Sequence, residues 1–394
     1  MALDRARRHE LRLLAASRAG YPALLTLGRF VRPIRRVPGL GWLVSDAGTI
    51  RRILNDPDHF TILGEGIVGH LWAQVLGDWV YGMFDGAGHH ALRMRTRGLF
   101  TEDSAAALVA RAAGPRLRQC TADLVAGQTV DIADLATVVV GRVVADLLSL
   151  ESGGPTDDDA RYREIYASGV ELSALAASST TSTHLPTRTV ATGRAIVARL
   201  TGGVAAAWRD AAGDTLAGRC RELGLDRRET AGLAALLTVA GTQTTASAMA
   251  RTVALLHDTA QQQQLHAEPR RVGAAVREGL RVTSPVPVIG RSVSADLEIA
   301  GRQLRAGQRV LMLTHTVDNA SGGFNLDRER PPDSRHFSFG AGRHYCLGAP
   351  VGRAELSALL NALLATGRPW RITERRYGRG LLIPAYTRLG VTLT

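Results

Sequence analysis

The longest regular pattern of apolar and polar positions runs from Asp226 to about His257. Its residues suit a helix throughout, and no proline interrupts them. Asp226 and Glu229 stand three positions apart at the start, which is the spacing of a capping box. At about 1.5 Å per residue the helix would be roughly 45 Å long. We therefore expect a helix that crosses a whole domain.

Helical patterns also dominate the rest of the chain. An amphipathic helical pattern covers residues 102–150, and residues 45–54 predict a short capped helix. Brief runs such as Gly41–Ser45 resemble strands. Leu and Ala are abundant while aromatic residues make up only 5%, which also favours helices. The expected fold is mainly α with small β-sheets, in a single domain over residues 1–394.

The net charge of the chain is strongly basic. It carries 48 basic against 36 acidic side chains, a net charge of +12, and the basic side chains are all arginine. A GC-rich genome accounts for the missing lysine. Such a charge attracts acidic proteins or nucleic acid. The sequence has no basic stripe interleaved with aromatic residues, so we expect no nucleic-acid partner.

The cysteines and the apolar segments of the chain indicate the cellular compartment of the protein. Cys120, Cys220 and Cys346 are far apart and show no C-x-x-C spacing, so we expect neither disulfides nor structural zinc. This usage is typical of a reducing compartment and predicts a cytoplasmic protein. The apolar segments 11–16 and 22–27 fall far short of the roughly 20 residues that span a bilayer. We expect no signal peptide and no membrane anchor.

Candidate chemistry is concentrated in residues 336–348, a glycine-rich loop that contains Cys346. Pro350 suits the first turn of a following helix, so the cysteine would lie just ahead of the positive end of a helix dipole. The glycines allow positive φ angles and close approach of the backbone to a flat partner. We expect a lowered thiolate pKa and a sulfur that binds a soft metal ion. The alternative is a buried free cysteine in a glycine-rich turn.

The loop resembles the haem-binding signature of the cytochrome P450 family, Phe-Gly-x-Gly-x-His/Arg-x-Cys-x-Gly. The matching residues are Phe339, Gly340, Gly342, His344, Cys346 and Gly348. The resemblance implies the triangular P450 fold and haem b (iron protoporphyrin IX) as the cofactor. It makes Cys346 the axial thiolate ligand of the iron, whose electron donation favours O–O cleavage.

Further motifs of this family occur in order along the chain. His89 and Arg93 match a His-x-x-x-Arg pair that binds a haem propionate, although in isolation the pair fits a solvated helix face equally well. The resemblance gives Arg291 and His344 further propionate contacts. It also implies a structural group that helps to hold the thiolate loop, consisting of Glu278, Arg281 and Arg328.

The middle of the long helix resembles the family pattern Ala-Gly-x-acid-Thr. Ala240, Gly241 and Thr244 share one face, where the glycine leaves room for a flat ligand and O₂. The resemblance makes Thr244 the oxygen-site threonine, whose hydroxyl can donate and accept hydrogen bonds. Gln243 stands where the family has an acid. Because glutamine cannot release a proton near neutral pH, either protons arrive by another path or Gln243 only preserves shape and a water network.

Substrate contacts are expected from three regions. Residues 62–83 form an apolar stretch, residues 165–190 resemble a mobile lid, and residues 285–291 resemble a segment that faces the substrate. The candidate pocket residues are Trp72, Trp79, Val286, Val288, Ile289 and Tyr386. Gly64–Gly69 also spells G-x-G-x-x-G, but no βαβ unit surrounds it, so we do not expect a dinucleotide site.

The resemblance implies an oxidoreductase of secondary metabolism that uses O₂ and electrons from a ferredoxin and its reductase. The candidate docking residues for the ferredoxin are Arg95, Arg97, Arg343 and Arg353. Because of Gln243, we favour oxidative C–C or C–N coupling of a small aromatic substrate such as a tryptophan-containing cyclodipeptide. Hydroxylation or epoxidation of a small apolar metabolite by a monooxygenase is the alternative. A haem-binding sensor or carrier without turnover is a third class, against which Thr244 argues.

Overall fold

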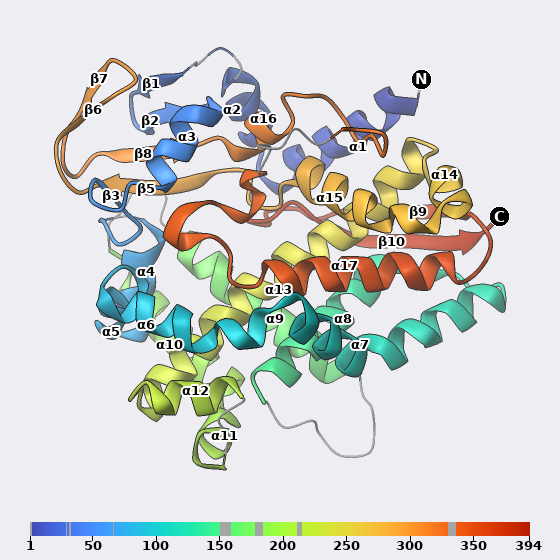
Figure 1. Ribbon diagram of the computed structural model, residues 1–394, viewed down its shortest axis with the longest axis horizontal. Helices are drawn as coiled ribbons and strands as arrows, with labels where there is room; N and C mark the ends of the chain where they lie inside the picture. Colours follow the sequence, from blue (N-terminus) through green and yellow to red (C-terminus); the bar gives the residue numbers. More distant parts are fainter. Residues whose placement is uncertain are drawn as a thin grey trace.

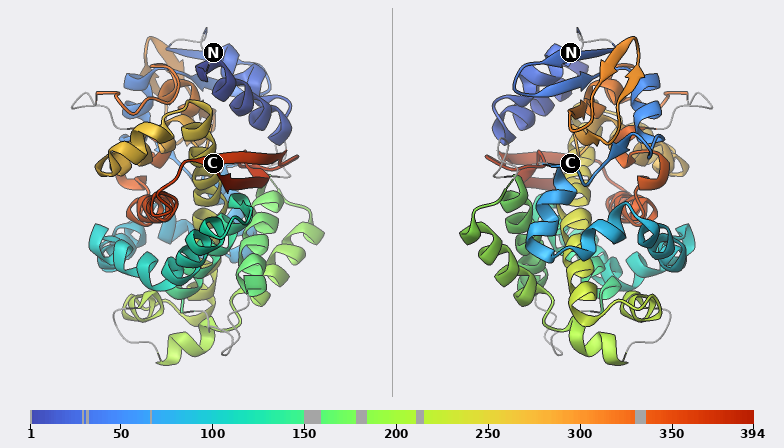
Figure 2. Two further views of the ribbon diagram at one scale, coloured as in Figure 1. Left: turned by 90° about the vertical axis from the view of Figure 1, so that its right-hand side faces the viewer. Right: turned by 90° about the vertical axis from the view of Figure 1, so that its left-hand side faces the viewer.

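Helix α13 (Arg227–Asp258) runs through the middle of the molecule in both views of Figure 2. Asp226 caps it, and both hydrogen bonds of the capping box with Glu229 are formed. Its 32 residues give a length of about 48 Å, which confirms the long helix predicted from Asp226 to about His257. The computed structural model describes residues 2–28, 30, 33–65, 67–149, 159–177, 184–210, 215–329 and 336–394.

Helices make up most of the described chain (Figure 1). Those before α13 are α1 (Ala2–Ser17), α2 (Tyr21–Gly28), α3 (Ala47–Leu54), α4 (Val68–Leu76), α5 (Trp79–Phe84), α6 (Ala87–Thr96), α7 (Glu102–Val125), α8 (Ile132–Leu147), α9 (Asp159–Ala177), α10 (Thr187–Leu200), α11 (Val204–Asp210) and α12 (Leu216–Glu222). Those after it are α14 (Gln262–Ala267), α15 (Val272–Thr283), α16 (Thr314–Asp318) and α17 (Ala349–Leu364). The expectation of a mainly α protein is confirmed.

The strands form small sheets, as expected. The largest has the order β1 (Ile34–Val37), β2 (Gly41–Val44), β8 (Arg309–Met312), β5 (Ile289–Val293), β3 (Phe60–Thr61). The second has the order β4 (Val130–Asp131), β10 (Tyr386–Leu393), β9 (Trp370–Tyr377), and the third pairs β6 (Leu297–Ile299) with β7 (Arg302–Leu304). Strands β2 and β8 are parallel, and the other described pairs are antiparallel.

One local prediction needs correction, the short capped helix is confirmed, and a third prediction lies partly outside the described chain. Residues 102–150 form two helices, because Gly127 takes a left-handed φ of 81° after α7 and the next residues pair as β4 with β10. The cap of α3 is Asp46, whose carboxylate accepts the Thr49 N–H at 2.8 Å. Within the expected lid, residues 178–183 lie outside the described residues.

The packing around α13 positions the cysteine loop. Helices α8, α9, α15 and α17 all contact α13, and its middle is buried in the main apolar core. Helix α17 contributes Leu356, Leu359 and Leu360 to the same core, each fully buried. Burying such a leucine is worth about 1.5–3 kcal/mol. The start of α17, which directly follows the cysteine loop, is therefore held against the middle of α13.

Ion pairs join α1 to the far end of α13. The Arg251 side chain is fully buried and pairs with Glu10 of α1, and its Nη1 lies 3.5 Å from the Pro384 carbonyl before β10. Asp258 at the end of α13 binds Arg375 of β9 at 2.5 and 2.6 Å. In the part of the chain that the structure describes, no helix is both long and apolar enough to cross a membrane.

We predict that Arg251→Met destabilises the protein by about 3–5 kcal/mol, because it leaves the buried Glu10 carboxylate without its partner. Chemical denaturation followed by circular dichroism measures this change. The double variant Glu10→Gln/Arg251→Met should recover most of the loss, since no charge is then stranded. A single variant as stable as the parent would show that the pair contributes nothing.

Candidate functional site

The cysteine loop is built from two short 3-10 turns and glycines in special conformations. Phe337–Phe339 form the first turn, and Gly340 follows with a φ of 70°. Gly342 has a φ of 66°, and a Cβ on it would lie 2.2 Å from the Leu54 carbonyl oxygen. Only glycine fits there, for both conformational and steric reasons. The N–H of Cys346 then donates to the Phe339 carbonyl at 2.9 Å, which closes the loop.

Cys346 is accessible, although many protein atoms surround its thiol. Burial raises the pKa of its thiol. Two kinds of group lower this pKa: the backbone N–H groups of Gly348 and Ala349, and the charges of Arg93 and Arg353. Their effect does not outweigh that of burial. The expected lowering of the thiol pKa is therefore wrong for the protein alone. A bound metal cation would supply the charge that favours the thiolate.

The predicted propionate residues gather on one side of the cysteine loop. The rings of His89 and His344 lie 4.6 Å apart between centroids. Arg93 donates to the Tyr345 carbonyl at 2.7 Å, so α6 is fastened to the loop. Arg291 of β5 is buried, and its Nη1 donates to the Gly290 carbonyl at 2.8 Å. The structure thus brings together residues that are more than 200 positions apart in the sequence.

Asp85 is the acidic member of this cluster. Its Oδ1 lies 2.9 Å from His344 Nε2 and 2.9 Å from Arg343 Nη2, and its Oδ2 accepts the Thr61 hydroxyl. Burial alone would raise the pKa of Asp85, but these hydrogen bonds and charges together lower it to about 2. No motif in the sequence points to this role of Asp85, because its partners Thr61 and His344 lie 24 and 259 positions away in the chain. Its contacts with Thr61 and the cysteine loop fit no dinucleotide site.

Burial also shifts the pKa of the basic groups. Desolvation, followed by the nearby charges of His344 and Arg93, lowers the pKa of His89 to about 4. Burial lowers the pKa of Arg291 to about 10, so this guanidinium remains charged at neutral pH. A desolvated cation attracts a carboxylate more strongly than an exposed one.

The middle of α13 leaves open space beside Gly241, and we name this space the groove. A Cβ on Gly241 would meet only the Val144 side chain at 3.7 Å within 4 Å. Thr244 is partly exposed there, and its hydroxyl donates to the Ala240 carbonyl at 2.7 Å. Gln243 is 4% exposed, and its Oε1 has no partner among the described residues. An unpartnered buried amide oxygen is costly unless water or another group satisfies it.

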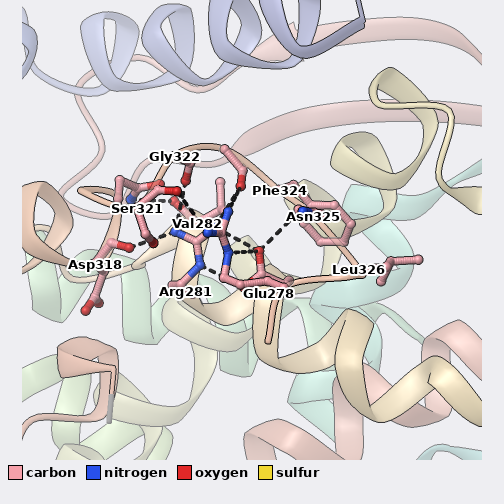
Figure 3. A network of polar contacts seen from close by, with 12 residues as sticks. Glu278, Arg281, Val282, Asp318, Ser321, Gly322, Phe324, Asn325 and Leu326 are labelled. Carbon is pink, nitrogen blue, oxygen red and sulfur yellow. Dashed lines mark hydrogen bonds and ion pairs between the residues drawn. The ribbon is translucent and has the colours of Figure 1, made fainter. Parts of the chain in front are cut away.

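The structure brings together the three residues predicted to form a structural group, and Figure 3 shows the contacts around Glu278 and Arg281. Arg281 binds both oxygens of Glu278 at 2.9 and 2.8 Å, and Arg328 Nε reaches Glu278 Oε2 at 3.2 Å. Arg281 also donates to the Asp318 carbonyl at 2.7 Å. The Asp318 carboxylate in turn accepts the Phe337 N–H at 2.9 Å. This chain of bonds joins α15 directly to the start of the cysteine loop.

The candidate pocket residues separate into two groups. Val286, Val288 and Ile289 are partly exposed, as pocket-lining residues would be. Trp72 is 7% exposed in a core cluster of α4, α9, α10 and α13, and Trp79 packs against Gly232 of α13. These two positions remain predictions.

Tyr386 does not have the position that was expected. Its ring is 5% exposed and lies in the main core, 5.6 Å from the Tyr377 ring. Burial raises its pKa strongly. Because β10 pairs Tyr386 with Tyr377 of β9, the side chain is held within the β9–β10 layer instead of facing a pocket.

Comparisons of sequence give a consistent set of relatives. The family model described as Cytochrome P450 matches residues 209–366. Pentalenic acid synthase of Streptomyces avermitilis is 38% identical over 166 residues, which cover 41% of this chain and 39% of that protein. Cytochrome P450 105A3 of Streptomyces carbophilus is 40% identical over 144 residues, or 35% of each chain. The match therefore spans about two-fifths of the length of these curated relatives.

Comparisons of structure extend over nearly the whole chain. A crystal structure of P450BioI in complex with an acyl carrier protein superposes with a TM-score of 0.76 and 22% identity, covering 94% of this chain and 98% of that one. The CalO2 structure gives a TM-score of 0.77 and 24% identity, covering 96% and 97%. At such identities the likeness establishes the fold.

The fold, the cysteine loop and the buried Glu-Arg-Arg group resemble those of haem-thiolate proteins. Residues 209–366 match the model of that family, cytochrome P450, and the fold is that of the solved P450 structures. Proteins of this family are oxidoreductases and bind haem b.

The residues of this chain fit that cofactor. Cys346 is a free and accessible cysteine, and the missing side chain at Gly241 leaves space on α13, the helix against which α17 packs. Arg291 offers a buried guanidinium, which has five N–H donors and uses one of them on Gly290. Cys346 would hold the iron, and Arg291, Arg93, His89 and His344 would hold the propionates. The haem would supply the oxygen chemistry.

We predict that Glu278→Gln lowers the free energy of unfolding by about 3 kcal/mol near neutral pH, because two arginines lose their buried counter-charge. Burial alone would raise the pKa of Glu278, but its bonds to Arg281, Asn325 and Arg328 together lower it below the ordinary 4.5. The stabilisation is thus complete above pH 4.5 and is lost as the pH falls through the lower, folded-state pKa.

Urea denaturation of both proteins across this pH range measures the effect. The matched control is Glu171→Gln, which breaks an exposed pair with Arg199 and should change stability by no more than about 1 kcal/mol. A difference between parent and Glu278→Gln that stays constant as the pH falls would contradict the argument.

Proposed function

We propose that the protein is an O₂-dependent haem-thiolate oxidase of bacterial secondary metabolism. The observation that carries this proposal is the placement of Cys346 just before α17, which packs against α13, the helix with open space beside Gly241. A sensor or carrier needs the thiolate and the propionate contacts, but has no use for a hydroxyl in the groove. The relatives named above support an oxidative role, since pentalenic acid synthase is named for the formation of a product.

Within this class we infer oxidative C–C or C–N coupling of a small aromatic substrate, such as a tryptophan-containing cyclodipeptide. In coupling, the substrate loses two hydrogen atoms and O₂ is reduced to two water molecules with two external electrons and two protons. Gln243 supports this inference because it removes the acid that the family has beside the oxygen-site threonine. The partly exposed side chains of Val286, Val288 and Ile289 offer an apolar surface for such a substrate.

Hydroxylation is the second candidate. It consumes the same O₂, electrons and protons, but places one oxygen atom in the product. The structure of HmtN, described as a post-tailoring hydroxylase in himastatin biosynthesis, superposes with a TM-score of 0.73 at 23% identity. This relative favours hydroxylation of a natural product as the competing reaction.

Electrons would come from a separate ferredoxin and its reductase. Arg95 and Arg97 are exposed at the end of α6 and on the turn after it, and neither has a carboxylate partner within the described residues. Arg353 lies on the same side, where it pairs with Glu102, and Arg343 pairs with Asp85. Unpaired arginines around the thiolate side would attract an acidic electron carrier.

The first expected outcome concerns the reduced protein with carbon monoxide. The parent should show the strongly red-shifted Soret band of a thiolate-ligated haem, and Cys346→Ala should lose it, because alanine cannot ligate iron. The difference spectrum measures this directly, and Cys120→Ala is the matched control because Cys120 is buried in the core away from the loop. An ordinary haem-protein band in the parent would exclude the oxidase.

The second expected outcome concerns the product. Incubation with a tryptophan-containing cyclodipeptide, ferredoxin, reductase and ¹⁸O₂ should yield a product that is lighter than the reactants by two hydrogen atoms and free of ¹⁸O. Mass spectrometry distinguishes this from hydroxylation, which adds one labelled oxygen. A labelled product would replace coupling by hydroxylation, and an absence of turnover despite a thiolate-type spectrum would favour a sensor or carrier.

A further inference from the structure

A basic cleft lies between α1 and the β9–β10 strand pair. Its volume is about 520 Å³, which is within the range of small-molecule sites. The lining residues come from α1, from the two strands and from their connection, and they are Arg12, Ala16, Arg376, Tyr377, Arg379 and Thr387. Three of these side chains are guanidinium groups, and none of the six carries a carboxylate.

Two of the lining arginines have no counter-charge. Arg376 pairs with Glu374 at 2.7 Å, but Glu374 also pairs with Arg388 at 2.6 Å. Arg12 and Arg379 are exposed, and neither has a carboxylate partner among the described residues. Because a guanidinium group stays protonated in proteins, the cleft holds two positive charges that the described chain does not neutralise.

The other charges near this side of α1 do not offset that excess. Asp258 is the nearby carboxylate at the end of α13, and it pairs with Arg375 at 2.5 Å and with Arg5 at 3.5 Å. Burial, and after it the charge of Arg375, lowers the pKa of His9 to about 4, and Arg5 and Arg12 add to this effect while Asp258 opposes it. His9 is therefore neutral near pH 7, and the potential beside it is positive.

The cleft adjoins the connection between β9 and β10, residues 378–385. Gly380 of this connection has a φ of 67°, and its N–H donates to the Ala16 carbonyl of α1 at 3.2 Å. Arg379 is the residue before it, whereas Arg12 lies one turn before Ala16 on α1. An anion bound by both arginines would thus join the helix to the connection.

We propose that this cleft binds the phosphate group of a small molecule. A phosphate monoester carries a charge of about −1.5 to −2 near neutral pH and has three acceptor oxygens. This charge matches the two unpaired guanidinium groups of Arg12 and Arg379, which bind phosphate oxygens in pairs. A carboxylate offers one charge and two oxygens. The volume also leaves room for an organic body next to the phosphate. The inference goes beyond the proposed oxidase function and does not depend on it.

Isothermal titration calorimetry of the haem-loaded protein tests the site, in a phosphate-free buffer of low ionic strength that limits screening. The probes are inorganic phosphate and phenyl phosphate, with benzoate as the singly charged comparison. Arg12→Gln/Arg379→Gln should weaken the binding of both phosphates by at least about 10-fold, because charge-assisted hydrogen bonds are lost. Tighter binding of phenyl phosphate would assign the site to an ester, and tighter binding of inorganic phosphate to the free ion.

The matched control is Arg35→Gln/Arg36→Gln. It removes two exposed arginines from β1, so the net charge falls by the same amount while the cleft is unchanged. This variant should bind phosphate as the parent does. Equal weakening in both double variants would show that only the general positive charge attracts the anion, and would overturn the proposal. Failure of the parent to bind either phosphate, or equally tight binding of benzoate, would also overturn it.

Hydrogen exchange gives the second readout. A phosphate bound by Arg12 and Arg379 should slow the exchange of the Gly380 N–H, because it holds the connection against α1. Arg12→Gln/Arg379→Gln should abolish this slowing, and circular dichroism checks that the variant folds, as expected for exposed side chains. Phosphate binding without any slowing would place the anion elsewhere and overturn the proposal. Both readouts measure binding alone, so a failure of the oxidase function would leave them unchanged.

Discussion

The bonding of Arg281 is the interaction on which the geometry of the site depends. This side chain is 2% exposed, and its guanidinium binds Glu278 and three main-chain carbonyls, of Asp318, Gly322 and Gly323. A buried guanidinium must satisfy its donors, so the segment carrying those carbonyls has little freedom to move. The Asp318 carboxylate of this segment also accepts the N–H of Phe337, at the start of the cysteine loop. The position of Cys346 is thereby set from α15, far from the sulfur itself.

Arginine suits this role better than lysine would. Its planar fork presents several donors at fixed angles, so one residue can bind a carboxylate and several carbonyls together. Arg251, Arg291 and Arg375 are also largely buried, each against carboxylates or carbonyls. A chain whose basic residues are all arginine can thus place many cations inside the fold. Part of the positive charge of this chain therefore lies inside the protein and not on its surface.

Sequence alone predicts those features of the protein that depend on residues close together in the chain. The capping box of α13 and the glycines around Cys346 act within a few residues, so their patterns are visible in the chain. The ion pair of Glu278 with Arg281 is visible for the same reason, because its members are three positions apart on one helix. These local signals sufficed for the fold class and for the haem-binding loop.

The remaining features arise from contacts between distant segments. Asp85 contacts His344 across 259 positions, and Arg93 of α6 donates to the Tyr345 carbonyl across 252 positions. The position of Tyr386 depends on the register of β10 against β9, because this register directs the Tyr386 side chain toward the core. The thiol pKa of Cys346 was misjudged because burial, a property of the whole fold, outweighs the helix start next to it. No short pattern in the sequence encodes such effects.

Strand β10 has a further consequence for how the molecule forms. It pairs with β9 and also with β4, so Gly390 and Val391 lie against Asp131 and Val130. Helix α1 is likewise bound to β9, through His9 and Tyr377, which are 368 positions apart. Contacts of such high sequence separation slow folding, since long loops must close before they form. During synthesis, the earliest helix must wait for almost the last strand to emerge, and its apolar face stays exposed to chaperones and to aggregation until then.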